Sequence, residues 1–196
     1  MALLDEHGRT FADELSLDVA KNTPSPLFGL LLASLLLSTR INAELAISAA
    51  RELRKAGMTS ADRVLAADDQ AIWQALERGR YLRKDRTTPM LRETAQLAAE
   101  RYDGDLRKLR GEANGDVDRA AALLREFKGI GAVGSEIFLR EVQVAWTELA
   151  PFAGERALAA APDHDLPRDA AKLAKLVPAS DFPRLAAALV RSRLEG

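Results

Sequence analysis

The chain of 196 residues has no cysteine and only two histidines. These absences exclude disulfides, thiolate zinc sites, cysteine-ligated iron–sulfur clusters, cysteine nucleophiles and histidine-rich metal sites. Aromatic residues make up only 5% of the chain, so aliphatic side chains and alanine must fill most of the core. The formal net charge is close to zero, at -1, while hydrophobic residues reach 47% and charged residues 29%. This composition is typical of a globular protein and not of a disordered one.

Long apolar runs are scarce as well. The longest run, residues 27–37 (LFGLLLASLLL), is much shorter than the roughly 20 residues that a membrane-spanning helix needs. Pro24 and Pro26 precede it, and Ser38-Thr39-Arg40 follows it. Because the run is apolar on every side, it predicts a helix buried in the middle of the fold. Residues 1–10 include charged side chains and lack the apolar core of a secretion signal, so we expect a cytoplasmic protein without membrane contact.

Helical spacing of apolar residues recurs along the whole chain, and no stretch alternates apolar and polar residues over the length of a strand. The predicted fold class is therefore all-α. Residues that favour helix ends give the expected helix starts at Asn42, Thr59 or Ser60, Asp68 or Asp69, Thr88-Pro89 and Asp116. The expected stops are Gly57, Gly79 and Gly104, and five prolines (151, 162, 167, 178 and 183) divide the C-terminal part into short helices.

Residues 129–134 read GIGAVG, which formally matches the G-x-G-x-x-G pattern of dinucleotide-binding proteins. That pattern requires a preceding strand in a parallel βαβ unit, whereas an amphipathic helix over residues 117–127 precedes it here. A helix, a tight Gly-x-Gly turn and a second helix instead predict a helix–hairpin–helix. Gly129 and Gly131 permit backbone conformations closed to other residues, and the outward amides would hold one phosphate. An ordinary αα-hairpin without a ligand fits the turn equally well.

Four segments stand in an order that resembles the endonuclease III branch of the helix–hairpin–helix base-excision DNA glycosylases. They are LLLASLLLSTR, LERGRYLRK, LLREFKGIGAVGSEIFL and AAKLAKLVPASDFPRLAAALV. The resemblance covers roughly residues 24–193. It implies two helical domains: a six-helix barrel over 24–133 that ends in the hairpin, and a second domain from 1–23 and 134–196. Double-stranded DNA would lie across the cleft between them.

The resemblance also implies roles for the hairpin. The family's Leu-Pro-Gly-Val-Gly pattern matches Phe127, Lys128, Gly129, Ile130 and Gly131. Amides from Gly129 to Ala132 would then bind a DNA phosphate. The backbone carbonyls of Arg125, Phe127 and Ile130 would hold Na⁺ or K⁺, and we expect no other cofactor.

Two arginines match the side chains that the family inserts into a distorted duplex. Arg40 matches the polar residue that enters the gap left by a flipped base, and Arg80 matches a second wedge. The basic run from Arg78 to Arg86, which includes Arg83 and Lys84, indicates DNA contact beside that wedge. A second basic cluster, Arg101, Arg107, Lys108 and Arg110, is interleaved with acids and is expected to form solvated helix faces. Trp73 and Trp146 lie at helical apolar spacing and are expected in the core.

The chain departs from the family at the two residues that carry its chemistry. The lysine that forms a Schiff base in family lyases is replaced by Val133, and the family's aspartate falls at about Ala153. Loss of both removes the nucleophile and the group that stabilises the developing sugar cation. Glu148 and Glu155 are the nearest acids that would replace the aspartate.

These observations support two classes of function. The first is a monomeric DNA-binding protein related to base-excision repair, which binds damaged or distorted duplex with altered or absent glycosylase and lyase chemistry. The alternative is a non-catalytic helical scaffold or protein-interaction module that retains only the fold. DNA binding requires Arg40, Arg80 and the hairpin amides to line one cleft.

Overall fold

The computed structural model of the chain describes residues 2–39 and 41–193, and every regular element within these ranges is a helix. The predicted all-α class is therefore confirmed. The α-helices are α1 (Ala2–His7), α2 (Phe11–Glu14), α3 (Pro24–Leu37), α4 (Ala43–Lys55), α5 (Ala61–Ala66), α6 (Asp69–Arg78), α7 (Lys84–Tyr102), α8 (Arg107–Ala113), α9 (Val117–Arg125), α10 (Ala132–Val142), α11 (Glu155–Ala160), α12 (Ala170–Ala174) and α13 (Phe182–Ser192). Four 3₁₀ helices, η1 (Val19–Lys21), η2 (Thr147–Leu149), η3 (Ala161–His164) and η4 (Ala179–Asp181), lie in the connections.

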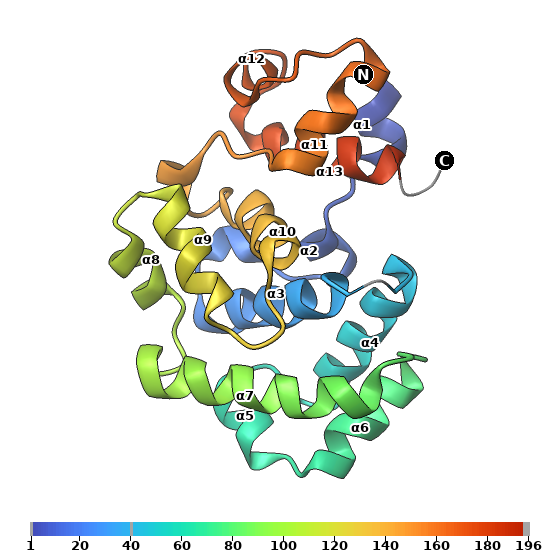
Figure 1. The fold of residues 1–196 in the computed structure, drawn as a ribbon, viewed down its shortest axis with the longest axis vertical. Coiled ribbons are helices and arrows are strands. Elements are labelled where there is room, and N and C mark those ends of the chain that lie inside the picture. The colour runs from blue at the N-terminus through green and yellow to red at the C-terminus, as the bar shows by residue number, and fades with distance from the viewer. Residues whose placement is uncertain (1, 40, 194–196) are drawn as a thin grey trace.

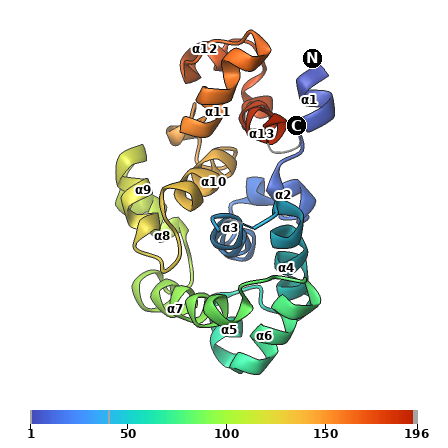
Figure 2. The ribbon, with the colours of Figure 1, turned by 45° about the vertical axis from the view of Figure 1, so that its right-hand side comes forward.

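The apolar helix α3 lies in the middle of the fold, as its sequence predicts. Figure 2 shows it nearly end-on, with α2, α4, α7, α9 and α10 around it. Leu27, Phe28, Leu30 and Leu31 are completely buried. No helix in the described part of the chain is long and apolar enough to cross a membrane.

The buried side chains form two hydrophobic cores. The larger one extends along the chain from Phe11 to Leu149. The smaller one joins Leu3 of α1 to residues 153–190, and Figure 1 shows α1, α11 and α13 at one end of the molecule, where α13 packs against both of the others. Helices α2 and α10 belong to the larger core, although the sequence places both in the second domain.

Four of the five predicted helix starts are confirmed, because a side-chain oxygen accepts a backbone N–H at each of these four. The cap of α4 is Asn42, whose Oδ1 accepts from the Glu44 N–H at 2.7 Å. At the two starts with alternatives, Ser60 caps α5 and Asp68 caps α6. Asp116 caps α9 by accepting from the Arg119 N–H at 3.0 Å.

The expected start of α7 at Thr88-Pro89 is wrong, because the helix begins at Lys84 and contains Pro89. Proline lacks an N–H and gives up one helical hydrogen bond, to the carbonyl of residue 85. The Thr88 hydroxyl donates to the Lys84 carbonyl at 2.9 Å in the same turn. The extra turn changes the connection from α6, which is reduced to residues 79–83.

The two tryptophans and the second basic cluster are expected in the core and on solvated helix faces, respectively. Trp146 is completely buried as expected, but Trp73 is only half-buried. Its Nε1 donates to Asp85 at 2.6 Å, and the ammonium of Lys84 lies 5.0 Å from the ring centroid. The second basic cluster pairs with neighbouring acids, as in the 2.8 Å contact of Arg101 with Glu112.

We predict that Leu31→Ala lowers the free energy of unfolding by about 2–5 kcal/mol, because α3 is enclosed on all sides and cannot close the cavity. Urea denaturation followed by circular dichroism measures this change. Leu82→Ala is the matched control, since that leucine is 76% exposed and its truncation should change stability by less than about 0.5 kcal/mol. Equal losses in the two variants would contradict the central role of α3.

Candidate functional site

The glycine-rich turn joins α9 to α10 as a tight hairpin. Gly129 has φ +86°, and the Ile130 N–H donates to the Phe127 carbonyl at 3.0 Å across the turn. A Cβ on Gly129 would lie 3.2 Å from the Met90 sulfur, so the backbone favours glycine here and a larger residue would also displace Met90 slightly. Gly131 differs from the sequence expectation. Its φ of -98° suits any residue, and a Cβ there would meet nothing within 4 Å.

Polar contacts fix the hairpin against two other helices. The Ser38 hydroxyl, at the C-terminal end of α3, donates to the Gly129 carbonyl at 3.0 Å. The Thr94 hydroxyl of α7 donates to the Lys128 carbonyl at 3.3 Å. These bonds use carbonyls on the inner side of the turn. The side chain of Lys128 and the residues Gly129, Gly131 and Ala132 are exposed.

The loop between α6 and α7 is fixed to the same end of α3. The Tyr81 side chain is buried, and its hydroxyl donates to the Leu36 carbonyl at 3.0 Å and lies 2.9 Å from the Thr39 hydroxyl. Burial raises the pKa of Tyr81, which keeps the hydroxyl protonated and able to donate. Gly79 permits this placement, because a Cβ there would lie 2.4 Å from the Ala49 Cα.

Anchoring Tyr81 leaves its neighbours on the surface. Arg80, Leu82 and Arg83 are exposed, and Arg80 has a positive φ of 57°. Leu82 was not predicted as a site residue, because an isolated leucine in a basic run carries no signal of exposure. Lys84, in contrast, forms an ion pair with Glu77 at 2.5 Å. In the loop 80–83, the predicted basic run therefore presents one exposed arginine on each side of an exposed leucine.

Three predicted segments thus meet at the C-terminal end of α3: the residues after it, the loop 80–83 and the hairpin turn. Arg40, the predicted first wedge, lies outside the described residues. Its neighbour Thr39 contacts the Tyr81 hydroxyl, and Ser38 contacts the hairpin. Ser38 and Thr39 line the groove described below, whereas Arg80 and residues 129–132 do not, so a single cleft shared by Arg40, Arg80 and the hairpin amides stays a prediction.

A groove of about 930 Å³ begins beside this junction and runs between the two cores. Its walls come from α2, α10, α13 and the segment from Leu37 to Arg51, and Arg9 and Arg156 also line it. Val133 lies in its wall. Ala153 does not, because its side chain is buried in the smaller core.

The acid in the α10 wall of the groove is Glu136, which the sequence analysis did not select. Its carboxylate approaches Gly154, since an ideal Cβ on that glycine would lie 2.9 Å from Oε2. Glu148 lies elsewhere, where Arg110 donates to both its oxygens at 2.6 and 2.7 Å and lowers the pKa of the carboxyl. Glu155 is exposed and pairs with Arg168 at 2.5 Å. Neither predicted acid lines the groove.

The predicted cation ligands lie around the hairpin. The Phe127 carbonyl already accepts the Ile130 N–H, and both side chains are buried in the larger core. The Arg125 side chain donates to the Ser135 hydroxyl at 3.2 Å, which links the two helices of the hairpin. The site for Na⁺ or K⁺ at these carbonyls stays a prediction.

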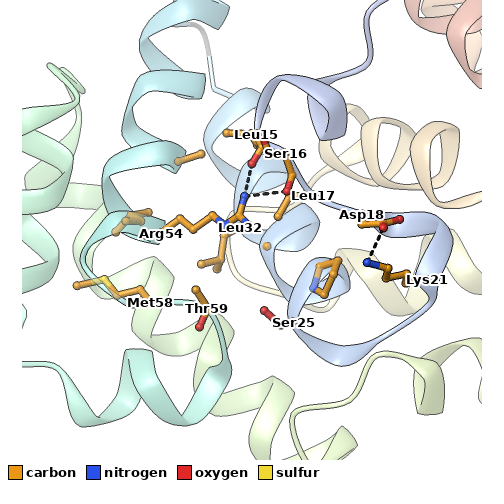
Figure 3. A pocket seen from close by; sticks show the side chains of 14 residues that line it. Leu15, Ser16, Leu17, Asp18, Lys21, Ser25, Leu32, Arg54, Met58 and Thr59 are labelled. Carbon is orange, nitrogen blue, oxygen red and sulfur yellow. Dashed lines mark hydrogen bonds and ion pairs between the residues drawn. The ribbon is translucent and has the colours of Figure 1, made fainter.

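A second hollow, of about 300 Å³, lies between the residues after α2, the start of α3 and the end of α4 (Figure 3). Leu32 and Met58 contribute apolar surface, while Arg54 donates to the Ser16 carbonyl at 2.9 Å and Lys21 pairs with Asp18 at 3.0 Å. Its basic groups are thus engaged within the protein. None of the predicted site residues that the structure describes lines this hollow.

Comparison of the chain with protein-family models, with curated proteins and with solved structures found no match. The site is therefore defined by its geometry. It combines the hairpin turn, an exposed leucine between two arginines, and a groove with charged walls.

We predict that Gly129→Ala destabilises the protein by about 1–2 kcal/mol, because alanine is strained at positive φ. Gly131→Ala should change stability by less than about 0.5 kcal/mol, because that residue has ordinary φ and open space. Thermal and urea unfolding measure both variants. Equal destabilisation would show that the turn has another conformation.

Proposed function

We propose that the chain binds double-stranded DNA and prefers damaged or distorted duplex, as a protein of the endonuclease III-like type. The observation that carries the proposal is the meeting of the hairpin turn, the loop 80–83 and the end of α3. A phosphate-binding turn positions a duplex, and an exposed apolar wedge beside it senses weakened base stacking.

The local charge supports the proposal more than the net charge does. Arg80 and Arg83 are exposed beside Leu82, and Lys128 is exposed on the hairpin. Only basic groups near the phosphates contribute to counterion release, so a chain with a net charge of -1 is compatible with DNA binding. The duplex would contact the hairpin through the amides at the start of α10, where the helix dipole favours an anion.

We assign the six-helix barrel of the family to the helices around α3, over residues 24–133, and the second domain to residues 1–23 with 134–196. The packing of helices around α3 supports the barrel, whereas the two hydrophobic cores divide the chain differently, because the larger core extends from Phe11 to Leu149. A nucleotide extruded from the duplex would enter the groove, because unpaired or damaged bases cost least to unstack.

The chemistry that this groove supports is limited. Val133 has no amine, so the proposal contains no Schiff-base step at this position. Glu136 is the carboxylate in the groove wall closest to the segment at Gly154, and it replaces Glu148 and Glu155 as the acid for any base hydrolysis. Recognition of the duplex does not depend on that step.

We predict that Leu82→Ala reduces the preference for abasic or mismatched duplex over intact duplex, because the wedge is lost. The salt dependence of the DNA affinity of this variant should stay unchanged, since no charge is removed. Arg83→Ala should instead weaken binding to all duplexes and reduce the slope of log K against log salt by about one. Fluorescence anisotropy at several salt concentrations measures both quantities.

The two variants serve as controls for each other. Equal effects on preference and on slope would contradict separate wedge and phosphate roles. A wild-type protein that binds none of these duplexes at low salt would contradict the proposal and favour the helical scaffold.

We predict that Gly131→Asp blocks the hairpin while keeping the fold. Gly131 is the N-cap of α10 with extended backbone, where aspartate accepts the free amides and stabilises the helix by a few tenths of a kcal/mol. The same carboxylate occupies the phosphate seat, so DNA affinity should fall by about tenfold or more.

Gly131→Ala is the matched control for this variant. It adds a methyl group in open space and no oxygen, so its affinity should stay within about threefold of wild type. Unchanged DNA affinity in a folded Gly131→Asp variant would remove the hairpin from the interface.

A further inference from the structure

A buried arginine lies in the wall of the groove. Arg140 of α10 lines the groove and is only 2% exposed. Its Nε and Nη2 are buried without a hydrogen-bond partner among the described residues. A buried N–H without an acceptor is costly, and more so when the group is charged. The Nε and Nη2 donors of Arg140 are therefore unsatisfied within the described residues.

The neighbouring acid, Glu141, does not accept from these two donors. Glu141 is also buried, but its two carboxylate oxygens accept from the backbone N–H groups of Phe11 at 2.9 Å and Ala12 at 2.7 Å. Its hydrogen bonds are thus directed at the start of α2. Burial lowers the pKa of Arg140 against the attraction of Glu141 and Glu136.

The groove around Arg140 carries further positive charge. Arg9, Arg51, Arg156 and Arg191 line it as well. Of the acids in its walls, Glu14 already accepts from Arg191 at 2.5 Å. The remaining acids, Glu44 and Glu136, are fewer than the arginines, so the groove attracts anions.

We propose that this groove is an oxyanion site in which the Nε and Nη2 edge of Arg140 binds a phosphate group. The N–H groups on this edge are parallel and match two oxygens on one phosphorus atom. The groove, at about 930 Å³, is large enough for a nucleotide attached to that phosphate. Because both nitrogen atoms are covered without a ligand, entry requires the side chains over Arg140 to shift.

The phosphate can come from a free small molecule or from a DNA strand, and both present the same chemistry to Arg140. The site does not rest on the proposed DNA binding, because inorganic phosphate tests it without any nucleic acid. Duplex DNA, added afterwards, distinguishes the two sources.

The experiment is calorimetric titration of the full chain with inorganic phosphate, with sodium chloride used to hold the ionic strength constant. We expect one bound phosphate in the wild type, and an affinity about tenfold or more weaker in Arg140→Met. Methionine retains much of the volume without the charge, so this variant should fold, with a lower stability because the buried Glu141 loses the attraction of Arg140. Circular dichroism and urea unfolding check this.

The matched control is Arg156→Met, which removes an exposed arginine from the same groove. It should weaken phosphate binding by no more than about threefold, because a solvated charge contributes only a screened attraction. Arg140→Lys is a second variant that keeps the charge and loses the two parallel donors. It should lose most of the affinity and provides the test should Arg140→Met fail to fold.

Equal losses in Arg140→Met and Arg156→Met would overturn the proposal in favour of general charge attraction, and so would a wild type that binds no phosphate. Displacement of phosphate by an abasic duplex would assign the site to a DNA strand, whereas simultaneous binding would assign it to a free phosphate ligand. A protein that binds phosphate through Arg140 but binds no duplex would retain this site while the DNA proposal fails.

Discussion

The burial of α3 is the constraint on which the rest of the structure depends. A helix that is apolar on all sides must be enclosed, and its burial brings helices from distant parts of the sequence around it. Its last carbonyls cannot be satisfied within the helix and need donors from elsewhere. The hydroxyl oxygens of Ser38, Thr39 and Tyr81 lie within hydrogen-bond distance of the carbonyl oxygens of Leu35 and Leu36 there, and each hydroxyl shares its single proton between this carbonyl and its other partner. The end of the central helix thereby becomes the point at which surface segments are assembled.

These polar contacts explain why the candidate interface is a composite. Ser38 spans from α3 to the hairpin carbonyl, while Thr39 and Tyr81 connect α3 to the loop before α7. Each bond holds the inner side of a turn and leaves its outer side exposed. The exposed residues of the hairpin turn and of the loop 80–83, with Leu82 at 76% exposure, are thus held in place by buried neighbours. Rigid positioning of this kind suits recognition of a fixed partner geometry.

The groove arises from the junction of the two cores. Glu141 ties α10 to the start of α2, and the Arg191 side chain of α13 pairs with Glu14 of α2. Directing the Glu141 carboxylate at backbone amides leaves the adjacent Arg140 without a direct acceptor. Glu141 therefore stabilises the junction. Because its carboxylate is bonded to these amides, Arg140 in the groove wall keeps two donors without an acceptor.

The sequence by itself determined the all-α class, the buried helix at 27–37, the capped starts of four helices and the turn at Gly129, because each follows from local rules of periodicity, capping and backbone conformation. It also indicated the basic loop. The tertiary structure decided that α7 includes Pro89, that Gly131 needs no glycine conformation, and that Glu148 pairs with Arg110 and not with the groove. It alone placed Glu136 and Arg140 in the groove and left Leu82 exposed. Charged and apolar residues on a helix or loop have the same local pattern whether they face solvent, a partner or a cavity, so only the packing of distant segments decides among these.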